Sequence, residues 1–570
     1  MAVVGEKTRQ ELASVRDTVE SIWVAIVLAF VLRAFVVEAF VIPTGSMAPR
    51  LFGEHLDLQC PQCGYEYAFG WSNEQRGYGP GSARVDTPKT PINARCPNCG
   101  CDRAPPEFLA GGDRVLVMKY LYRFREPEPW DVVVFKNPQD NRQNYIKRLI
   151  GLPGETIEIV HGNVFVSHDG GKTFRIRRKT DPKVQRAMWH VAFDNDYRPT
   201  RPANPTGLPG AENLEYPEWR PEDQAADALW DLSELGGRRF RFKGAKAPAS
   251  LSFRPTTETF LPRYGYNAGL HSDRQLDVIS DLKLETTFIP QAADSLLALT
   301  LTSFEHAFRG EIAASGAVRL LYRPDDGNSA SWSELASPAR LAPMKVGRGC
   351  EVALAHVDQQ VVLWVDGEAV LVSRERDSDG PDDRQKYPMD YKVLKTLMAE
   401  ARKQSGSEPI PTPRVKIEAS GGACRLSHIR LLRDVYYTSP RLDSPPDGPA
   451  GDFARRLGVR KNDLGWGTAD RAITLTRYPD RPDLDQFFVM GDNSPSSLDG
   501  RLWTSAAPTL RLYAPSGSGN SGRRLYQLGT VPRYNMIGKA IFVYWPSGFR
   551  VPMFPSLPIL PNVGRMRLIR

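Results

Sequence analysis

The sequence lacks a long run of basic residues. Lys and Arg number 74 against 66 Asp and Glu, and the two signs are mixed along the 570 residues, giving a formal net charge of +8. Nucleic-acid-binding proteins usually concentrate positive charge in a patch or stripe. The composition therefore predicts no nucleic-acid partner, and it is equally compatible with a mild attraction to anionic lipid head groups.

Long apolar runs are also scarce, since only residues 22–40, IWVAIVLAFVLRAFVVEAF, form one. At about 1.5 Å per residue this run just reaches the roughly 30 Å of a hydrocarbon core, although Arg33 and Glu38 interrupt it. No small-x-small cleavage site follows it, which disfavours a removable signal peptide. Basic residues precede the apolar run, which favours a cytoplasmic N-terminus. We expect a single-pass transmembrane helix over residues 21–42, with residues 1–20 in the cytoplasm and the remainder outside.

Continuous helical patterns are rare in the rest of the chain. Gly and Pro contribute 47 residues each, which favours short strands and loops. Alternating segments such as DRVLVMK and WDVVVFK, and many more between residues 182 and 433, have the period of half-buried strands. The sequence thus predicts a mainly β protein with several domains, in which residues 182–433 form an inserted β-sandwich.

Cysteine is infrequent, with seven residues in the chain, but four of them form two Cys-x-x-Cys pairs, each followed by Gly. Two such pairs are typical of a tetrahedral zinc site, and two disulfides are the alternative in an oxidising compartment. We favour a structural zinc, because four thiolates would leave no coordination position for water. The predicted ligands are Cys60, Cys63, Cys96 and Cys99. For Cys350 and Cys424 both a disulfide and two buried thiols remain open.

A His-centred catalytic motif is missing, and so is a GxSxG nucleophile turn. Ser46 follows the apolar run in PTGSM, where a serine is most often a turn residue. A serine hydroxyl becomes a nucleophile only when a nearby base takes its proton. Lys147, in NYIKRLIGLPG, qualifies if apolar neighbours bury it without a carboxylate, because burial lowers the pKa of a lysine. In a strand, Arg148 would point to the opposite face.

The strings PTGSMAPRL, GDRVLVMK, YIKRLIGLPGE, GDNSPSSLDGR and IGKAIFVYWP resemble, in order and wording, the motifs of type I signal peptidases, the membrane-bound Ser/Lys endopeptidases. The resemblance leaves both large inserts outside it. A second resemblance is confined to VVLWVDGEAV, which is similar to a strand-turn-strand of concanavalin A-like jelly rolls.

The signal peptidase resemblance implies roles for individual residues. Ser46 would be the nucleophile, Lys147 the general base and Ser497 the serine that orients the lysine. The oxyanion would be bound by the Ser46 backbone N–H and the Thr44 hydroxyl. The bracing residues would be Asp492, Asn493, Asp499 and Arg501. Two positions depart from the family pattern, since Ser494 replaces an Arg and Gly500 replaces a Ser. Lys119 is treated by the family pattern as structural.

The implied function is removal of signal peptides from exported preproteins, after small-x-small sites, at the outer face of the bacterial cytoplasmic membrane. The substrate would lie extended beside a strand edge, at Asp113–Met118 and Pro43–Ser46. The candidate contacts are Pro43, Asp113, Val115 and Val117. The implied partners are the preproteins and the lipid bilayer, and no cofactor is expected for catalysis. The alternative is a membrane-tethered protein whose sandwich binds a glycan or envelope ligand while the peptidase core is inactive.

The predicted order along the chain follows from these motifs. Residues 43–58, 105–181 and 434–556 would form the catalytic core, with 59–104 as the cysteine insert and 182–433 as the sandwich. Within the last core segment, residues 504–530 are predicted to be a loop insertion. Residues 557–570 show no periodicity and are predicted to be a tail.

Overall fold

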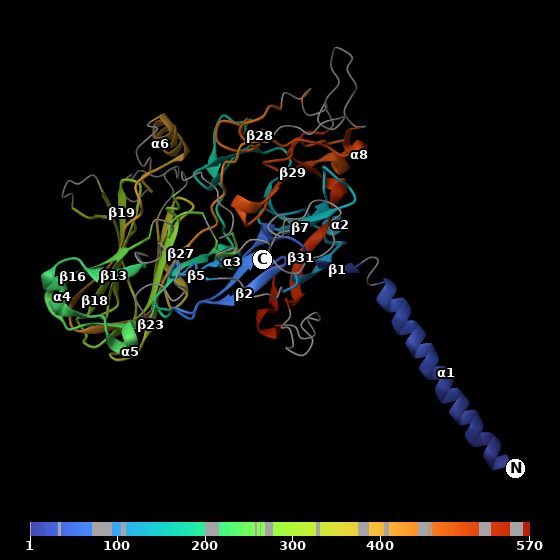
Figure 1. The fold of residues 1–570 in the computed structure, drawn as a ribbon, viewed down its shortest axis with the longest axis horizontal. Coiled ribbons are helices and arrows are strands. Elements are labelled where there is room, and N and C mark those ends of the chain that lie inside the picture. The colour runs from blue at the N-terminus through green and yellow to red at the C-terminus, as the bar shows by residue number, and fades with distance from the viewer. Residues whose placement is uncertain are drawn as a thin grey trace.

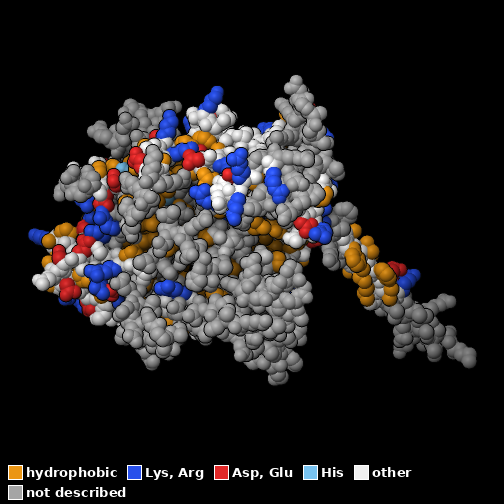
Figure 2. Space-filling model, turned by 45° about the horizontal axis from the view of Figure 1, so that its top comes forward, with side chains coloured by type: hydrophobic (Ala, Val, Ile, Leu, Met, Phe, Trp, Pro, Cys, Tyr) orange, Lys and Arg blue, Asp and Glu red, His pale blue; other side chains and the backbone are white. Residues whose placement is uncertain are grey.

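The computed structural model describes most of the chain from Ala2 to Arg570. Outside the description lie residues 1, 32–35, 71–93, 104–109, 200–215, 257–258, 263, 268–277, 326–330, 374–386, 404–409, 443–454, 456–458, 512–525 and 548–561. Helix α1 (Ala2–Val31) projects from the body of the protein (Figure 1). Figure 2 shows apolar side chains along it. Those most exposed are Val19, Ile22, Trp23, Val24, Ile26, Val27, Leu28, Phe30 and Val31.

The structure differs from the predicted transmembrane helix in the second part of residues 21–42. Helix α1 ends at Val31, and strand β1 (Val37–Val41) occupies the second part of the predicted span. Within the described part of the chain, no helix combines the length and the apolarity that crossing a bilayer requires. Valine and phenylalanine suit a strand as well as an apolar helix. Pairing with β6 decides the outcome, and Glu38 in β1 forms an ion pair with Lys119 at 3.1 Å.

The central sheet is built from segments that are far apart in the sequence. Its order is β1-β6-β31-β7-β8-β29-β30, with β32 beside β31. The bounds are β6 Arg114–Met118, β7 Val132–Lys136, β8 Asn144–Gly151, β29 Gln486–Met490, β30 Val531–Pro532, β31 Met536–Trp545 and β32 Arg567–Leu568. Strand β8 therefore has paired neighbours on both sides, which buries its middle.

A smaller sheet, β11-β10-β9-β28, adjoins the central one. Its strands are β9 Thr156–Val160, β10 Asn163–Ser167, β11 Arg175–Ile176 and β28 Ile473–Thr474. Ile157 and Ile159 of this sheet pack with Phe488 and Met490 of β29. The two sheets thus share an apolar core, which holds β29 in place beside β8.

Between β12 and β27 the chain builds two further eight-stranded sheets. The first contains β12 His190–Asp194, β14 Trp230–Asp231, β15 Arg239–Phe242, β17 Leu282–Pro290, β23 Cys350–Val357, β24 Gln360–Val365, β25 Glu368–Val372 and β27 Cys424–Arg433. The second contains β13 Glu218–Pro221, β16 Ala245–Arg254, β18 Leu296–Ser303, β19 His306–Ala313, β20 Ala317–Pro324, β21 Ser333–Glu334, β22 Ala339–Arg340 and β26 Val415–Gly421.

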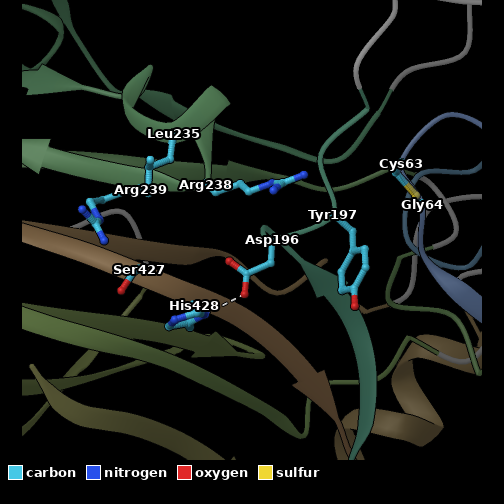
Figure 3. Close-up of a pocket in the computed structure, with 9 residues that line it drawn as sticks. All are labelled: Cys63, Gly64, Asp196, Tyr197, Leu235, Arg238, Arg239, Ser427 and His428. Atoms are coloured by element: carbon cyan, nitrogen blue, oxygen red, sulfur yellow. Dashed lines mark hydrogen bonds and ion pairs between the residues drawn. The ribbon is translucent and has the colours of Figure 1, made fainter.

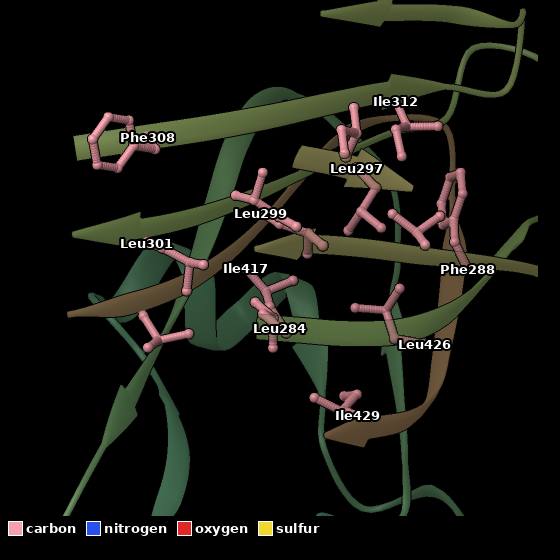
Figure 4. Packing of buried hydrophobic residues seen from close by; sticks show 14 of the residues in the cluster. Leu284, Phe288, Leu297, Leu299, Leu301, Phe308, Ile312, Ile417, Leu426 and Ile429 are labelled. Atoms are coloured by element: carbon pink, nitrogen blue, oxygen red, sulfur yellow. The ribbon is translucent and has the colours of Figure 1, made fainter. Parts of the chain in front are cut away.

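These two sheets face each other across one apolar core (Figure 4). Along β17 buried and half-buried residues alternate, so that Leu284 and Phe288 point inward. Leu297, Leu299 and Leu301 of β18 meet them from the other sheet. A period-two pattern with one buried face is what a sandwich requires. Together with the central sheet, the sandwich confirms the predicted mainly β fold.

Apart from α1, the longest helix is α6 (Tyr391–Lys403) among the described residues. The short helices there are α2 Leu121–Phe124, α3 Pro182–Met188, α4 Gln224–Leu229, α5 Glu234–Gly237 and α8 Pro508–Arg511. Two hairpins carry the cysteine pairs. They are β2 (His55–Gln59) with β3 (Glu66–Gly70), and β4 (Ala94–Arg95) with β5 (Asp102–Arg103).

Two predictions about irregular segments need correction. In the predicted tail, β32 pairs with β31 and Ile569 is 4% exposed in the core of the central sheet, because its apolar side chain completes that cluster. In the predicted loop insertion, Leu510 and Tyr526 pack with Leu442. The central part of that insertion, 512–525, lies outside the described residues.

Candidate active site

Ser46 lies in a single turn of 3-10 helix, Gly45–Met47, directly after β1. Its side chain is 7% exposed. Asn493 fixes the turn from the opposite segment, because its backbone N–H donates to the Ser46 carbonyl at 3.0 Å and its Nδ2 donates to the Gly45 carbonyl at 2.9 Å. The turn after the apolar run is therefore part of a tertiary site.

Lys147 reaches this turn from the middle of β8. Its Nζ donates to the Ser46 Oγ at 2.6 Å and to the Ile146 carbonyl at 3.2 Å. The residue is 3% exposed. The strand alternation sends the neighbouring Arg148 to the other face, as expected. The structure thus brings the two predicted members of the dyad into direct contact.

The electrostatic surroundings of Lys147 favour a neutral amine. Burial lowers the pKa of Lys147 from 10.5 to about 8, and the positive charge of Arg501 adds to the lowering. The charges of Asp499 and Asp492 oppose it and are outweighed. Burial lowers a lysine pKa because the ammonium loses its hydration. A substantial fraction of the amine can therefore act as a base near neutral pH.

Asp499 and Arg501 form a buried brace behind the dyad, and both are fully buried. Arg501 donates to the carboxylate of Asp499 through Nε at 2.9 Å and Nη2 at 2.7 Å, and the Gly491 N–H donates to the same carboxylate at 2.9 Å. Burial raises the pKa of the Asp499 carboxyl, but the charge and hydrogen bonds of Arg501 outweigh burial and leave that pKa below its usual value. Asp499 is thus held charged, and its effect on the pKa of Lys147 is opposed by the positive charge of Arg501.

The two departures from the family pattern fit this brace. Ser494 accepts from Arg501 Nη1 at 2.6 Å and from the Thr438 N–H at 2.8 Å, so the serine hydroxyl has taken a place in the brace. Gly500 has no room for a side chain, because a Cβ there would lie 2.6 Å from the Gly529 carbonyl oxygen. Both departures are therefore accommodated by local contacts.

Arg148 and Asp492 form a second buried pair on the far face of β8. Arg148 donates to Asp492 through Nε at 2.6 Å and Nη2 at 2.5 Å, with side-chain exposures of 0% and 2%. Arg148 Nη1 also donates to the carbonyls of Trp130 and Arg570. Because Asp492 directly precedes Asn493, the pair anchors the segment that holds the Ser46 turn.

Of two predicted supporting residues, Ser497 lacks its expected hydrogen bond, whereas the oxyanion role of Thr44 stays a prediction. The Ser497 Oγ is buried and has no hydrogen-bond partner within the described part of the chain, so the predicted bond to Lys147 is not formed. A Cβ on Gly491 would lie 2.2 Å from that oxygen and 2.4 Å from the Ser46 carbonyl, which places Ser497 beside the turn. Thr44 is exposed and makes no capping hydrogen bond.

The predicted substrate edge at Asp113–Met118 is wrong. Strand β6 is paired with β1 on one side and β31 on the other, so it has no open edge. Val115 and Val117 are fully buried in the apolar core. The Asp113 carboxylate is buried as well, and it accepts from the N–H groups of Phe52 and Ser547. Pro43 is exposed. Strand β1 is the outermost strand of the sheet as described.

The four predicted metal ligands lie together. The Sγ atoms of Cys60, Cys63, Cys96 and Cys99 are all buried and lie within 4.8 Å of one another. The Cys60–Cys99 distance is 3.5 Å and the Cys63–Cys96 distance is 3.7 Å. A disulfide would place two sulfurs about 2.05 Å apart, so neither pair is a disulfide. Sulfurs at tetrahedral positions about 2.3 Å from one zinc would be about 3.8 Å apart.

The sequence did not reveal every residue at the site. For Arg148 the sequence predicted only that it points to the opposite face of its strand, and Thr438 carried no motif. Asn267, inside the sandwich segment, exchanges hydrogen bonds with Asn493. No local pattern marks these residues, since their partners are remote in the sequence.

A cavity of about 450 Å³ lies between the cysteine hairpins and the sandwich (Figure 3). Neither Ser46 nor Lys147 lines it. In it His428 and Asp196 form an ion pair at 2.7 Å. Its lining is Cys63, Gly64, Asp196, Tyr197, Leu235, Arg238, Arg239, Ser427 and His428. This cavity is separate from the dyad.

Comparison with known proteins finds a family match in the part of the chain that carries Lys147. The family described as "Signal peptidase, peptidase S26" matches residues 106–201 and 475–545, which include Lys147 but not Ser46. "Probable signal peptidase I-2" of Synechocystis sp. is 43% identical over 61 residues, covering 10% of this chain and 28% of that protein. "Signal peptidase I" of Rickettsia typhi is 27% identical over 154 residues, covering 27% of this chain and 44% of that protein.

These alignments span less than half the length of either relative. Among solved structures, carbohydrate-binding module CBM66 from Bacillus subtilis covers 37% of this chain and 94% of its own, with 8% identity and a TM-score of 0.22. The chain is therefore similar to signal peptidases of family S26 over residues 106–201 and 475–545, and it spans less than half the length of these curated relatives.

Proposed function

We propose that this protein is a serine endopeptidase that removes N-terminal signal peptides from exported preproteins, with Ser46 as nucleophile and Lys147 as general base. The observation that carries the proposal is the 2.6 Å contact between a buried lysine amine and a serine hydroxyl. A nucleophile within hydrogen-bond reach of a base is the arrangement that acyl transfer needs.

The reaction runs in two halves. The neutral Lys147 amine takes the proton of the Ser46 hydroxyl while Oγ attacks the scissile carbonyl carbon, and the Ser46 N–H and Thr44 hydroxyl would stabilise the oxyanion. When the C–N bond breaks, the lysine ammonium returns the proton to the leaving amine. Water, deprotonated by the same amine, then attacks the acyl-enzyme, and the proton passes to Ser46 as the enzyme is released.

The substrate would bind along β1 as an additional strand. Strand β1 leads directly into the Ser46 turn, and its partner β6 covers only one of its edges. A peptide on the other edge would present every second side chain to the same face. This spacing matches a small-x-small requirement before the cleaved bond, with Pro43 beside the substrate.

We also propose that α1 binds a lipid surface. Its exposed side chains include Trp23, Val24 and Phe30 at 63%, 67% and 65%. Such a surface is favourable when its apolar residues enter the headgroup region. Flotation with anionic lipid vesicles tests this, since Trp23→Glu with Val24→Glu should abolish flotation, whereas Arg16→Ala should retain most of it. Equal flotation of all three proteins would contradict the proposal.

A structural zinc at the cysteine cluster is the third part of the proposal. Cys60, Cys63, Cys96 and Cys99 would hold the ion, which would tie the two hairpins together. Because four thiolates would fill the coordination sphere of the ion, it would take no part in the cleavage step. A glycan or envelope ligand for the sandwich stays a prediction, and the intact dyad contact disfavours an inactive core.

Cleavage of a preprotein by the detergent-solubilised protein tests the proposed function. Wild type should cut after a small-x-small site, and Ser46→Ala and Lys147→Met should not, although both variants should retain the wild-type circular dichroism spectrum. Ser167→Ala provides a matched control, because this buried serine lies in β10 and bonds to Asp169 instead of the dyad. Equal cleavage by all four proteins would refute the assignment.

A further inference from the structure

The inserted sandwich segment contacts the catalytic turn through the short stretch Tyr264–Asn267. Gly265–Asn267 form a turn of 3-10 helix between β16 and β17. Tyr264 and Tyr266 pack with Ala48, two residues after Ser46. The family match stops at residue 201 and resumes at 475. This stretch is therefore an addition to the matched core that reaches its nucleophile.

Asn267 and Asn493 form a reciprocal pair of side-chain hydrogen bonds. Asn267 Nδ2 donates to Asn493 Oδ1 at 2.5 Å, and Asn493 Nδ2 donates to Asn267 Oδ1 at 2.9 Å. Asn493 Nδ2 also donates to the Gly45 carbonyl at 2.9 Å. The two side chains are 8% and 0% exposed, so water has little access to either.

This pairing fixes which way the Asn493 amide faces. If the amide rotated by half a turn, its oxygen would face the Gly45 carbonyl oxygen, and the hydrogen bond would be replaced by repulsion. Asn267 disfavours that rotation, because it supplies both an acceptor for the Asn493 N–H and a donor for the Asn493 oxygen. Without Asn267, the buried amide would lose two partners at once.

Tyr266 holds the same turn by packing. Its ring lies so close over Gly45 that a Cβ at that glycine would be 2.0 Å from the Tyr266 Cε1. The ring stacks on Phe52 with centroids 5.9 Å apart, and its hydroxyl donates to the Glu54 carbonyl at 2.9 Å. A residue of the same inserted stretch thus covers the nucleophile turn at Gly45.

We propose that Asn267 is a positioning residue for Ser46, acting through Asn493, so that the inserted sandwich completes the catalytic site of its own peptidase core. This inference rests on the proposed Ser46–Lys147 function. The 2.6 Å separation of Oγ and Nζ tolerates little displacement of the turn, and a shift of about 1 Å can cost about a hundredfold in rate. The insert therefore contributes to turnover as well as to stability.

The test is a double-mutant cycle on Asn267 and Asn493. Asn267→Ala should lower kcat for a small-x-small peptide about 10- to 100-fold and change KM less than about threefold, since the substrate strand lies on β1. In the Asn493→Ala background, Asn267→Ala should have little further effect, because the amide that it orients is gone. Asn195→Ala is the matched control, as it removes a buried amide that bonds to Gly237 within the sandwich. It should lower stability without lowering kcat.

The outcomes separate this inference from the proposed function. If the wild-type protein cleaves, two results would overturn the positioning role and leave the dyad standing. One is an Asn267→Ala variant with the wild-type kcat, and the other is an Asn195→Ala control that loses as much kcat as Asn267→Ala. Wild-type protein that fails to cleave would refute the proposed function and, with it, the positioning role. Thermal unfolding of the four cycle proteins adds a readout without turnover, in which strictly additive losses would contradict the Asn267–Asn493 contact.

Discussion

The proposed role of Lys147 as a base depends on its burial, because a buried ammonium ion loses the hydration that stabilises its charge. The amine contacts the Ser46 hydroxyl and the Ile146 carbonyl, both of which are neutral. The nearby Asp499 carboxylate forms an ion pair with Arg501 at 2.7 Å, and the positive charge of Arg501 itself lowers the pKa of Lys147. Burial therefore dominates and brings the pKa of Lys147 to about 8.

This pKa predicts the pH dependence of cleavage. Because only the neutral amine accepts the serine proton, kcat/KM should rise with pH and level off above about pH 8. The profile should be measured with a fluorogenic small-x-small peptide between about pH 6 and about pH 10. A flat profile, or a midpoint at the usual lysine value of 10.5, would contradict the account.

Sequence motifs were sufficient to select the residues of the dyad but not all of their contacts. Ser46 and Lys147 stand in strings whose wording pointed to one site, and the structure brings them together. Ser497 lies nearby without the expected bond to the lysine. Asn267 was missed because its partner is 226 positions away in the chain. A contact of that kind depends on how whole sheets are packed.

At the scale of secondary structure, β8 separates two functions by the alternation of its side chains. Lys147 faces the nucleophile turn, whereas Arg148 faces Asp492 in a pair that is almost completely buried. Two adjacent basic residues therefore differ in charge state, because Lys147 is proposed to react as the neutral amine and Arg148 stays in an ion pair. The alternation was predictable from the sequence, whereas the partner of Arg148 was not.

Neutralising Asp492 should strongly destabilise the protein. Asp492→Asn leaves Arg148 buried without its anion, which should lower the free energy of unfolding by about 3–5 kcal/mol. Urea unfolding followed by tryptophan fluorescence measures the change. Asp140→Asn is the control, because Asp140 pairs with an Arg142 whose side chain is 89% exposed, and it should cause no measurable change. Similar losses in both variants would contradict the importance of the buried pair.

The apolar run shows where local patterns fail. Residues 37–41 continue the apolar run, but they include two valines and a phenylalanine, which also suit a strand, and pairing with β6 makes them one. The cysteine hairpins are the opposite case. Their Cys-x-x-Cys spacing was enough to predict that four sulfurs gather at one point.

Removing the proposed zinc should loosen both cysteine hairpins. As purified, the protein should carry one equivalent of zinc per chain, and a strong chelator should remove it and lower the melting temperature. Metal analysis and calorimetry before and after chelation provide the measurement. Cys63→Ala should lower the zinc content, whereas Cys424→Ala, which removes a buried thiol outside the cluster, should leave it unchanged. Zinc-free wild type with full stability would exclude the structural metal.

At the scale of the whole molecule, the sandwich is joined to the catalytic core by buried charges as well as by the Tyr264–Asn267 stretch. Lys179 donates to Asp358 and Asp434 at 2.6 Å each, and Asp281 lies in the same group of carboxylates. Burial raises the pKa of Asp434 to about 7; Lys179 opposes this rise and the neighbouring Asp358 adds to it. One lysine thus balances several acids at the junction.

Loss of this lysine should destabilise the junction in a pH-dependent way. The raised pKa of Asp434 means that the folded state keeps a proton that the unfolded chain releases between about pH 4 and about pH 7. Folding is therefore penalised increasingly as pH rises through that window. Lys179→Met should lower the melting temperature more at pH 8 than at pH 5, while Lys416→Met, at a partly exposed pair, should change little at either. An equal loss for Lys179→Met at both pH values would contradict this assignment.

The larger arrangement could be predicted in outline only. Strand periodicity predicted a mainly β chain with an inserted sandwich, because each strand carries its own pattern. The docking of Ile569 and the reach of Asn267 could not be predicted, since they depend on contacts between distant segments. Both contacts join surfaces that become neighbours only after the sheets have assembled.

The central claim is that Lys147 is uncharged often enough at neutral pH to activate Ser46. The most direct measurement is an NMR titration of isotope-labelled lysine, with the Lys147 signal assigned by its absence in Lys147→Met. The account predicts a pKa of about 8 for that signal. A Lys147 signal that titrates at 10.5 or above, like an ordinary solvated lysine, would contradict it.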